Sequence, residues 1–345
     1  MTKECNGSIG LRANQSIYTR TVFMISLLVL LCALHIMIGE VEVEFKDVFS
    51  AIFSFNPDDF IHQVILKTRL PRLSIAIAVG MSLGVCGVLL QSIIRNPLAD
   101  PQILGLNAGA SMAVVIVSVF GLPSWVGNVD NLRPWIAAGG AFLSFSVVLL
   151  LSTAGRYGST PLKVTLCGIA VSAFLGALTS LILLLDERSL EELRVWLSGD
   201  FAGRSFSELR VVVPIMVLGV GAAIYYAPKL NALSLGNDMA RVLGLHVNYI
   251  RIGTLLTAAL LAGAAVTVAG PIGFVGLIVP HIVRRFIGSN LQYLIPFSAL
   301  GGALLLILAV LVGRIIIAPQ DLPSGIVIAA IGAPIYIIIV ARYFR

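Results

Sequence analysis

Apolar stretches long enough to cross a lipid bilayer recur along the whole chain. A transmembrane helix needs about 20 mainly apolar residues, and its backbone groups must be paired internally because the bilayer core holds no water. Charged residues make up only 12% of the chain, against about 25% in a soluble domain. We therefore predict an all-α, polytopic membrane protein with about ten transmembrane helices, near residues 21–39, 73–94, 103–120, 134–154, 164–185, 211–227, 252–269, 272–287, 291–313 and 323–341.

The spans are predicted to form one domain, residues 21–345, preceded by a polar tail, residues 1–20. No small-residue cleavage site follows the first apolar stretch, so we interpret it as a retained span. The eighth span opens after Gly270-Pro271 and contains Pro280, so surrounding protein must satisfy its freed backbone groups. The four cysteines are scattered, and they predict neither a disulfide framework nor a metal site.

Small residues recur at helical spacing inside several spans. Gly80, Gly84 and Gly87 follow one another in the second span, and Gly301-Gly302 lies in the ninth. Small side chains let helix backbones approach closely in a membrane. We expect most of these glycines to serve tight helix packing.

The distribution of charge predicts the orientation of the chain. If the N-terminus is cytoplasmic, that side holds 13 of the 23 basic residues but only 3 of the 17 acidic ones. Lys and Arg are enriched in cytoplasmic loops, so we expect both termini in the cytoplasm. The net charge of +6 is then a signal of topology, and no basic, aromatic-interleaved surface indicates nucleic-acid binding.

A polar segment, residues 228–250, separates the sixth and seventh spans and is expected to be cytoplasmic. Gly236 and Asp238 offer a turn and an acidic helix start, and Gly244 is a suitable stop. The predicted helix, within 231–245, has about two turns and is too short to be stable alone. Surface helices on lipid usually carry more Lys and Arg. A docking helix for a partner protein is therefore favoured over an interfacial helix.

The chain lacks the motifs of an energy-converting enzyme. It has no G-x-x-x-x-G-K-[ST] phosphate loop and no H-E-x-x-H motif. No Asp, Glu or Lys lies in the middle of a predicted span, where an ion-coupled transporter would need one. We assign no catalytic and no metal-ligating residue. The simplest interpretation is a transport pathway driven by a separate ATPase, with an ion-coupled secondary transporter as the less favoured alternative.

Two groups of motifs carry a family resemblance. The first contains R-L-P-R at 69–72, G-V-L-L-Q at 87–91 and R-N-P-L-A-D-P at 95–101. The second contains G-P-I-G-F-V-G-L-I-V-P-H at 270–281, L-P-S-G at 322–325 and G-A-P at 332–334. Together they closely resemble the FecCD-type permeases, the membrane subunits of ABC importers for ferric siderophores, haem and cobalamin.

The resemblance implies a type II ABC importer permease fold in a bacterial cytoplasmic membrane. The implied partners are a second permease subunit, identical or paralogous, two ATPase subunits and an extracytoplasmic binding protein. ATP and Mg²⁺ would bind the ATPase subunits, and this chain would bind no cofactor. The implied cargo is a ferric siderophore, with cobalamin or haem as alternatives.

The same resemblance implies functional residues. Residues that would couple the permease to the ATPase lie in the polar segment: Leu235, Gly236, Asp238, Met239, Ala240, Arg241, Leu243 and Gly244. Asp and Met replace the Glu and first Ala of the broader E-A-A-x-x-x-G importer pattern. Arg69, Arg72 and Arg314 would face outward and meet carboxylates of the binding protein; arginines anchored at the membrane interface are the alternative. Gating or pathway residues would be Gln91, Asn96, Pro97, Leu98, Ser159 and Thr160.

Overall fold

The computed structural model describes residues 4–39, 41–121, 129–154, 161–185, 196–201, 203–317 and 321–343. Every regular element in these ranges is helical, which confirms the all-α prediction. Each of the ten predicted spans corresponds to one helix. These helices are α1 (Glu4–Met37), α4 (Leu70–Ile94), α5 (Leu106–Phe120), α6 (Val129–Thr153), α7 (Pro161–Leu184), α9 (Phe206–Ser234), α11 (Val247–Ala269), α12 (Val275–Ile287), α13 (Leu291–Ile316) and α14 (Ser324–Tyr343).

Two of the ten helices are too short to cross a bilayer by themselves. Among the described residues, eight helices are long and apolar enough to span, whereas α5 has 15 residues and α12 has 13. At 1.5 Å per residue these two are about 22 and 20 Å long, against a hydrocarbon core of about 30 Å. Non-helical backbone therefore completes both crossings, and it must lie inside the protein.

The remaining helices are short and lie outside the predicted spans. They are α2 (Phe45–Phe53), α3 (Phe60–Val64), the π-helix η1 (Ile65–Arg69) and α10 (Asn237–Val242). The polar segment was predicted to form one helix within 231–245. In the structure α9 continues to Ser234 and only 237–242 forms the separate helix α10. Backbone hydrogen bonding in α9 thus continues beyond the apolar stretch that predicted the span.

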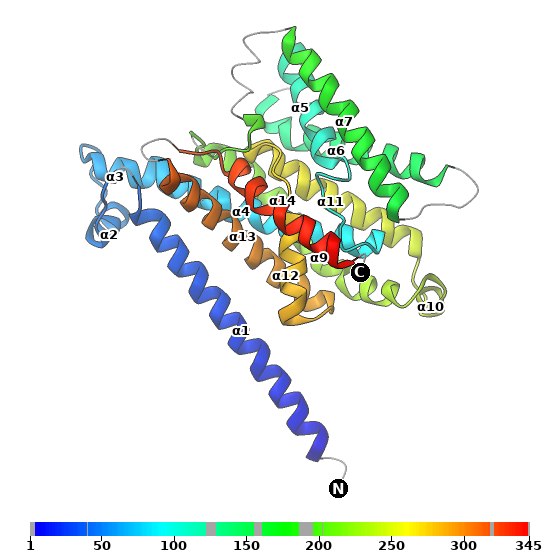
Figure 1. Ribbon diagram of the computed structural model, residues 1–345. Helices are drawn as coiled ribbons and strands as arrows, with labels where there is room; N and C mark the ends of the chain where they lie inside the picture. The colour runs from blue at the N-terminus through cyan, green and yellow to red at the C-terminus, as the bar shows by residue number, and fades with distance from the viewer. Residues whose placement is uncertain are drawn as a thin grey trace.

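Helix α4 lies at the centre of the bundle, where it packs against α13, α11, α12 and α9 (Figure 1). A Cβ atom added at Gly80 would lie 2.4 Å from the carbonyl oxygen of Gly302 on α13. One added at Gly87 would lie 2.0 Å from the carbonyl oxygen of Gly276 on α12. No side chain fits at either distance, so these glycines permit the backbone contacts predicted from the small-residue pattern.

Two parts of the molecule flank this centre. Helices α5, α6 and α7 pack on one another and form a group at the top of the view in Figure 1. Helix α1, on the opposite side, inclines away from the bundle toward its N-terminal end. In the most apolar part of its candidate span, Ile17–Met37, only 6% of the residues are buried inside the chain. Lipid or other protein therefore covers most of α1 in a membrane.

Candidate functional site

Helix α10 and the leucines on either side of it present apolar side chains to the outside of the molecule. Leu235 is 70% exposed and Val242 is 81% exposed, and Met239 and Leu243 are also exposed. Ala240 is fully buried, because this face of α10 packs on α9 and α11. An exposed apolar surface on a six-residue helix is typical of a protein-binding site rather than of a self-sufficient element.

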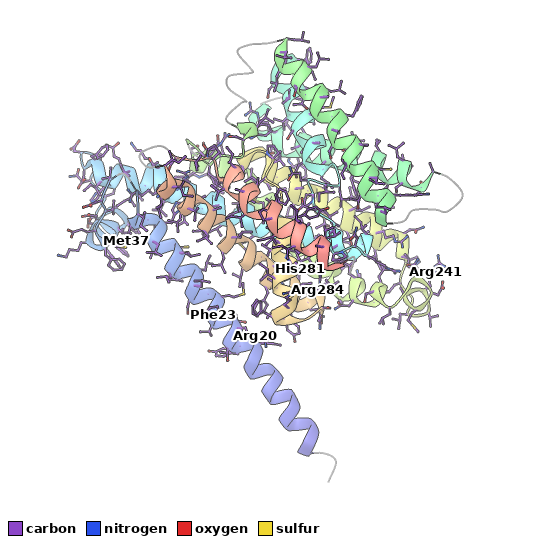
Figure 2. The ribbon with its side chains drawn as sticks, in the orientation of Figure 1. Arg20, Phe23, Met37, Arg241, His281 and Arg284 are labelled. Carbon is purple, nitrogen blue, oxygen red and sulfur yellow. The ribbon has the colours of Figure 1, made fainter. Side chains whose placement is uncertain are left out.

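The polar residues of α10 agree with the predicted caps but add little stability. Asp238 lies in the first turn and Arg241 in the last, where each charge suits the helix dipole. Their side chains form an ion pair of 3.4 Å and are 98% and 68% exposed, so the pair contributes little. Gly236 and Gly244 flank the helix with φ values of 122° and 77°. Figure 2 shows Arg241 at the edge of the molecule.

The start of the R-N-P-L-A-D-P motif is hydrogen-bonded to α10. The Nη2 atom of Arg95 donates to the carbonyl oxygen of Leu233 at 2.8 Å and to Oδ1 of Asn237 at 3.1 Å. Arg251 donates to the same Asn237 oxygen at 3.2 Å. Arg95 itself has φ 54°, an uncommon conformation for a residue with a side chain. The motif and α10 are thus held together by one guanidinium.

The acidic residue of the same motif lies at the N-terminal end of α12. Asp100 is 1% exposed, and its Oδ1 accepts a hydrogen bond from the backbone N–H of Gln102 at 2.9 Å. Burial raises the pKa of Asp100 to about 6, while backbone N–H groups that include those of Phe274 and Leu277 act against this rise. A carboxylate suits a helix N-terminus. Sequence reasoning missed Asp100, although an acid enclosed by apolar residues in a motif was an available signal.

Gln91 connects α4 to α12 near the same place. Its Nε2 donates to the carbonyl oxygen of Gly276 at 3.1 Å, and its Oε1 accepts from Arg284 at 3.0 Å. On the following helix, Asn107 donates to the carbonyl oxygen of Ile272 at 2.9 Å. The two motif groups that were recognised separately in the sequence therefore meet: Gln91 bonds to the first turn of α12, and Asn107 bonds to the non-helical backbone before it.

The predicted gating residues are distributed around this contact. Gln91, Asn96 and Leu98 are buried, and Leu98 packs in a small cluster with residues of α12 and α14. Asn96 accepts from the backbone N–H of Leu98 at 3.0 Å, which closes a turn. Pro97 lines a cavity of about 510 Å³ between α12 and α14. Ser159 and Thr160 lie outside the described residues, and gating by the others stays a prediction.

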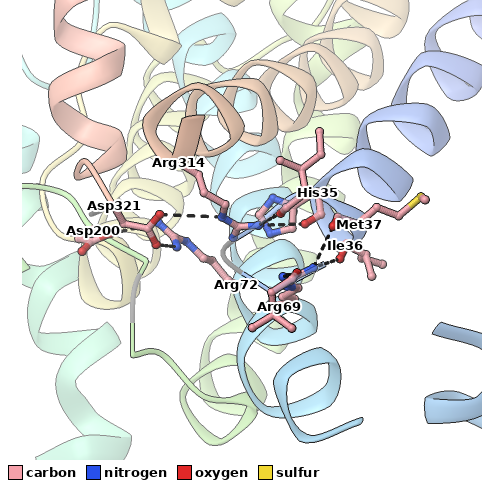
Figure 3. Close-up of polar contacts among 10 residues, drawn as sticks. His35, Ile36, Met37, Arg69, Arg72, Asp200, Arg314 and Asp321 are labelled. Carbon is pink, nitrogen blue, oxygen red and sulfur yellow. Dashed lines mark hydrogen bonds and ion pairs between the residues drawn. The ribbon is translucent and has the colours of Figure 1, made fainter. Parts of the chain in front are cut away.

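The three outer arginines come together, but they do not face solvent as expected. Arg69 is 4% exposed and donates to the carbonyl oxygens of Ile36 at 2.5 Å, Met37 at 3.1 Å and Val41 at 2.5 Å. Figure 3 shows this guanidinium at the C-terminal end of α1. The last carbonyl groups of a helix have no partner within it. Arg69 therefore caps α1, which explains its burial.

Arg72 and Arg314 have acidic and backbone partners of their own. Arg72 is 4% exposed, contacts the carboxylate of Asp321 and lies 3.8 Å from that of Asp200. Arg314 donates to the carbonyl oxygen of His35 at 3.1 Å and lies 3.9 Å from Asp321. The expectation of solvent-facing arginines is thus wrong because the chain supplies these partners itself (Figure 3). Binding-protein docking stays a prediction.

Local backbone chemistry positions the R-L-P-R motif. Pro71 has no N–H group, and its ring would clash with the carbonyl group four residues earlier in a regular helix. The chain forms the π-helix η1 just before it, where the N–H of Leu70 bonds to the carbonyl oxygen of Ile65. Single π-turns of this kind are frequent at functional sites. Here the turn accommodates Pro71 and places Arg69 against the end of α1.

These features define a multi-pass helical membrane protein whose central helices are hydrogen-bonded to the short peripheral helix α10. The chain belongs to the FecCD transport family, whose family model matches residues 27–342. The match covers α10 and both motif groups. It also confirms the resemblance recognised from the sequence.

Individual relatives match over nearly the whole chain. The Fe(3+)-citrate import system permease protein YfmD of Bacillus subtilis (strain 168) is 40% identical over 319 residues, covering 92% of this chain and 93% of YfmD. The hemin transport system permease protein HmuU of Yersinia pestis is 34% identical over 329 residues, covering 93% and 94%. A solved inward-facing structure described as a metal-chelate type ABC transporter has a TM-score of 0.77 at 29% identity, covering 94% of this chain and 100% of that one.

Proposed function

We propose that this chain is the permease subunit of an ABC importer that carries a ferric chelate. The favoured cargo is a ferric siderophore. Its membership of the FecCD transport family supports the permease role. The names of YfmD and HmuU, an Fe(3+)-citrate and a hemin permease protein, support an iron chelate and leave haem as the second candidate cargo. The permease would pair with a second permease subunit, in a bacterial cytoplasmic membrane with both termini in the cytoplasm.

The observation that carries this proposal is the exposed apolar surface of α10 together with the hydrogen bond that joins α10 to the R-N-P-L-A-D-P motif at 95–101. A separate ATPase would cover Leu235, Met239, Val242 and Leu243. Movement of α10 would pass through Asn237 to Arg95. From there the 95–101 stretch would move α12, whose N-terminal end Asp100 occupies. Nucleotide chemistry would belong to the ATPase, and this chain would supply the lever and the pathway.

On the other side of the membrane, an extracytoplasmic binding protein would deliver the chelate. Its acidic residues would have to compete with Asp200 and Asp321 for Arg72, or with Asp321 for Arg314. Such an exchange replaces one carboxylate by another, so it keeps the buried arginines paired. Docking would then open the contacts that hold the end of α13 against α1.

The test is uptake by defined vesicles. The chain is co-purified with its ATPase and second permease subunit, reconstituted, and supplied with the loaded binding protein and a radiolabelled ferric siderophore. Uptake should require ATP and should persist when proton and sodium gradients are collapsed. Matched vesicles that receive ferric haem with a haem-loaded binding protein test the second cargo. Accumulation by this chain alone on an ion gradient would contradict the proposal.

A further inference from the structure

An apolar groove lies between the inclined helix α1 and helices α12 and α13. Its volume is about 460 Å³, and its lining is almost entirely aliphatic and aromatic. Residues on its outer edge are exposed, Phe23 at 67%, Phe286 at 63% and Leu308 at 43%. The groove therefore opens toward the bilayer. Figure 2 shows α1, with Arg20 and Phe23 labelled, alongside α12.

One end of the groove is basic. Arg20 lines it and donates a hydrogen bond to the carbonyl oxygen of Phe286 in the last turn of α12. The same turn carries Arg284 and the exposed Arg285. No ion pair among the described residues involves any of these three arginines. Helices α12 and α13 contain no Asp or Glu, and α1 contains only Glu4, so the positive charge at this end is not balanced by the helices that form it.

The shape of the groove suits a thin and flexible occupant. It is bounded by α1 on one face and by α12 and α13 on the other, and it is open along one side. An extended hydrocarbon chain is thin and matches the aliphatic lining. The combination of an apolar groove with a basic end fits an amphiphile that has a negatively charged head. Basic pockets between transmembrane helices bind anionic lipid head groups.

We propose that the groove binds one anionic phospholipid, with an acyl chain between α1 and α13 and the phosphate against Arg20. Burial of the acyl chain stabilises the complex through apolar contact, and the arginine selects the charge of the head group. The lipid fills the space left by the inclination of α1. The lipid therefore holds α1 against the bundle. Direct contacts between α1 and the other helices bury few of the residues of α1.

The test is a lipid-competition measurement on the full-length chain in detergent. Native mass spectrometry counts the molecules retained from an equal mixture of phosphatidylglycerol and phosphatidylcholine. Wild type should keep one phosphatidylglycerol in preference to phosphatidylcholine. Arg20→Ala should lower that retention about fivefold, the factor that corresponds to about 1 kcal/mol per arginine near an anionic head group. Arg20→Lys, which keeps the charge, should retain most of the preference.

Two further variants separate the groove from general charge effects. Arg210→Ala removes an exposed cation on α9, away from the groove, and should change nothing. Leu308→Trp should reduce retention of both lipids because the larger ring occupies the groove, while the melting temperature shows that the chain is folded. Equal retention of the two lipids by wild type would overturn the proposal. Displacement of phosphatidylglycerol by inorganic phosphate would also overturn it, because the site would then bind a free anion and would not require an acyl chain.

Discussion

The guanidinium of Arg72 contacts the carboxylate of Asp321, although the two residues are 249 positions apart in the chain. The same guanidinium lies 3.8 Å from Asp200, and Asp321 also lies 3.9 Å from Arg314. Four charged side chains thus join the start of α4, the end of α13 and the two segments that carry the aspartates. Arg72 is almost completely buried, so its charge depends on these partners.

Replacing Arg72 with Gln should destabilise the protein because the buried Asp200 and the partly exposed Asp321 each lose an ion-pair partner. Breaking a fully buried pair costs about 3–5 kcal/mol. Because the side chain of Asp321 is 35% exposed, we expect the free energy of unfolding to fall by only about 2 kcal/mol. Chemical unfolding in detergent should show this loss as a lower midpoint. Arg210→Gln, an exposed arginine, serves as the control. Unchanged unfolding of the Arg72 variant would show that the network has no structural role.

This network also shows what the sequence could and could not predict. Periodic apolar stretches located all ten helices, and glycine spacing located the contacts of α4, because both depend on local composition. The burial of Arg69 and Arg72 depends on carbonyl groups about 30 residues away and on Asp321 far along the chain. Nothing near the R-L-P-R motif indicates those partners. Asp100 is a different case: its place in a motif was an available signal, and only its surroundings at α12 come from a distant segment.

Gly244 offers a test of the proposed coupling role of α10 that does not depend on steric clashes. Its φ is 77°, and an added Cβ would meet nothing within 4 Å. A β-branched residue disfavours this conformation, whereas Asn tolerates it. Gly244→Val should therefore lower ATP-driven uptake several-fold with normal membrane levels, and Gly244→Asn should retain uptake. Normal uptake by the Val variant would remove the end of α10 from the coupling path.

Asp100 predicts a dependence of stability on pH. Its folded pKa, about 6, lies above the ordinary value of about 3.9, so the folded chain binds the proton more tightly. The resulting stabilisation is fully present below about pH 4 and is lost as the pH rises through about 6. Thermal unfolding in detergent should show wild type losing stability between pH 5 and 7 more than Asp100→Asn does. Parallel curves for the two proteins would contradict this assignment.

The bond between Arg95 and α10 predicts a variant that folds well but does not transport. Arg95 adopts φ 54°, which costs a residue with a side chain about 1–2 kcal/mol. Its hydrogen bonds to Leu233 and Asn237 offset that cost and connect α10 to the R-N-P-L-A-D-P motif. Arg95→Gly removes the strain and the connection together. Its stability should therefore be close to that of wild type, whereas Arg95→Gln keeps the strain and should be less stable.

Transport assays distinguish these changes in stability from a loss of coupling between ATP hydrolysis and uptake. In the reconstituted complex, both Arg95 variants should leave ATP hydrolysis largely intact, because the exposed apolar surface of α10 is unchanged, while uptake falls at least several-fold. Arg251→Gln removes the other bond to Asn237 but does not touch the motif, so its uptake should fall less. A complex of Arg95→Gly that hydrolyses ATP and transports at the wild-type rate would show that α10 moves the pathway by another route. Loss of hydrolysis in the same complex would instead place Arg95 in the binding of the ATPase.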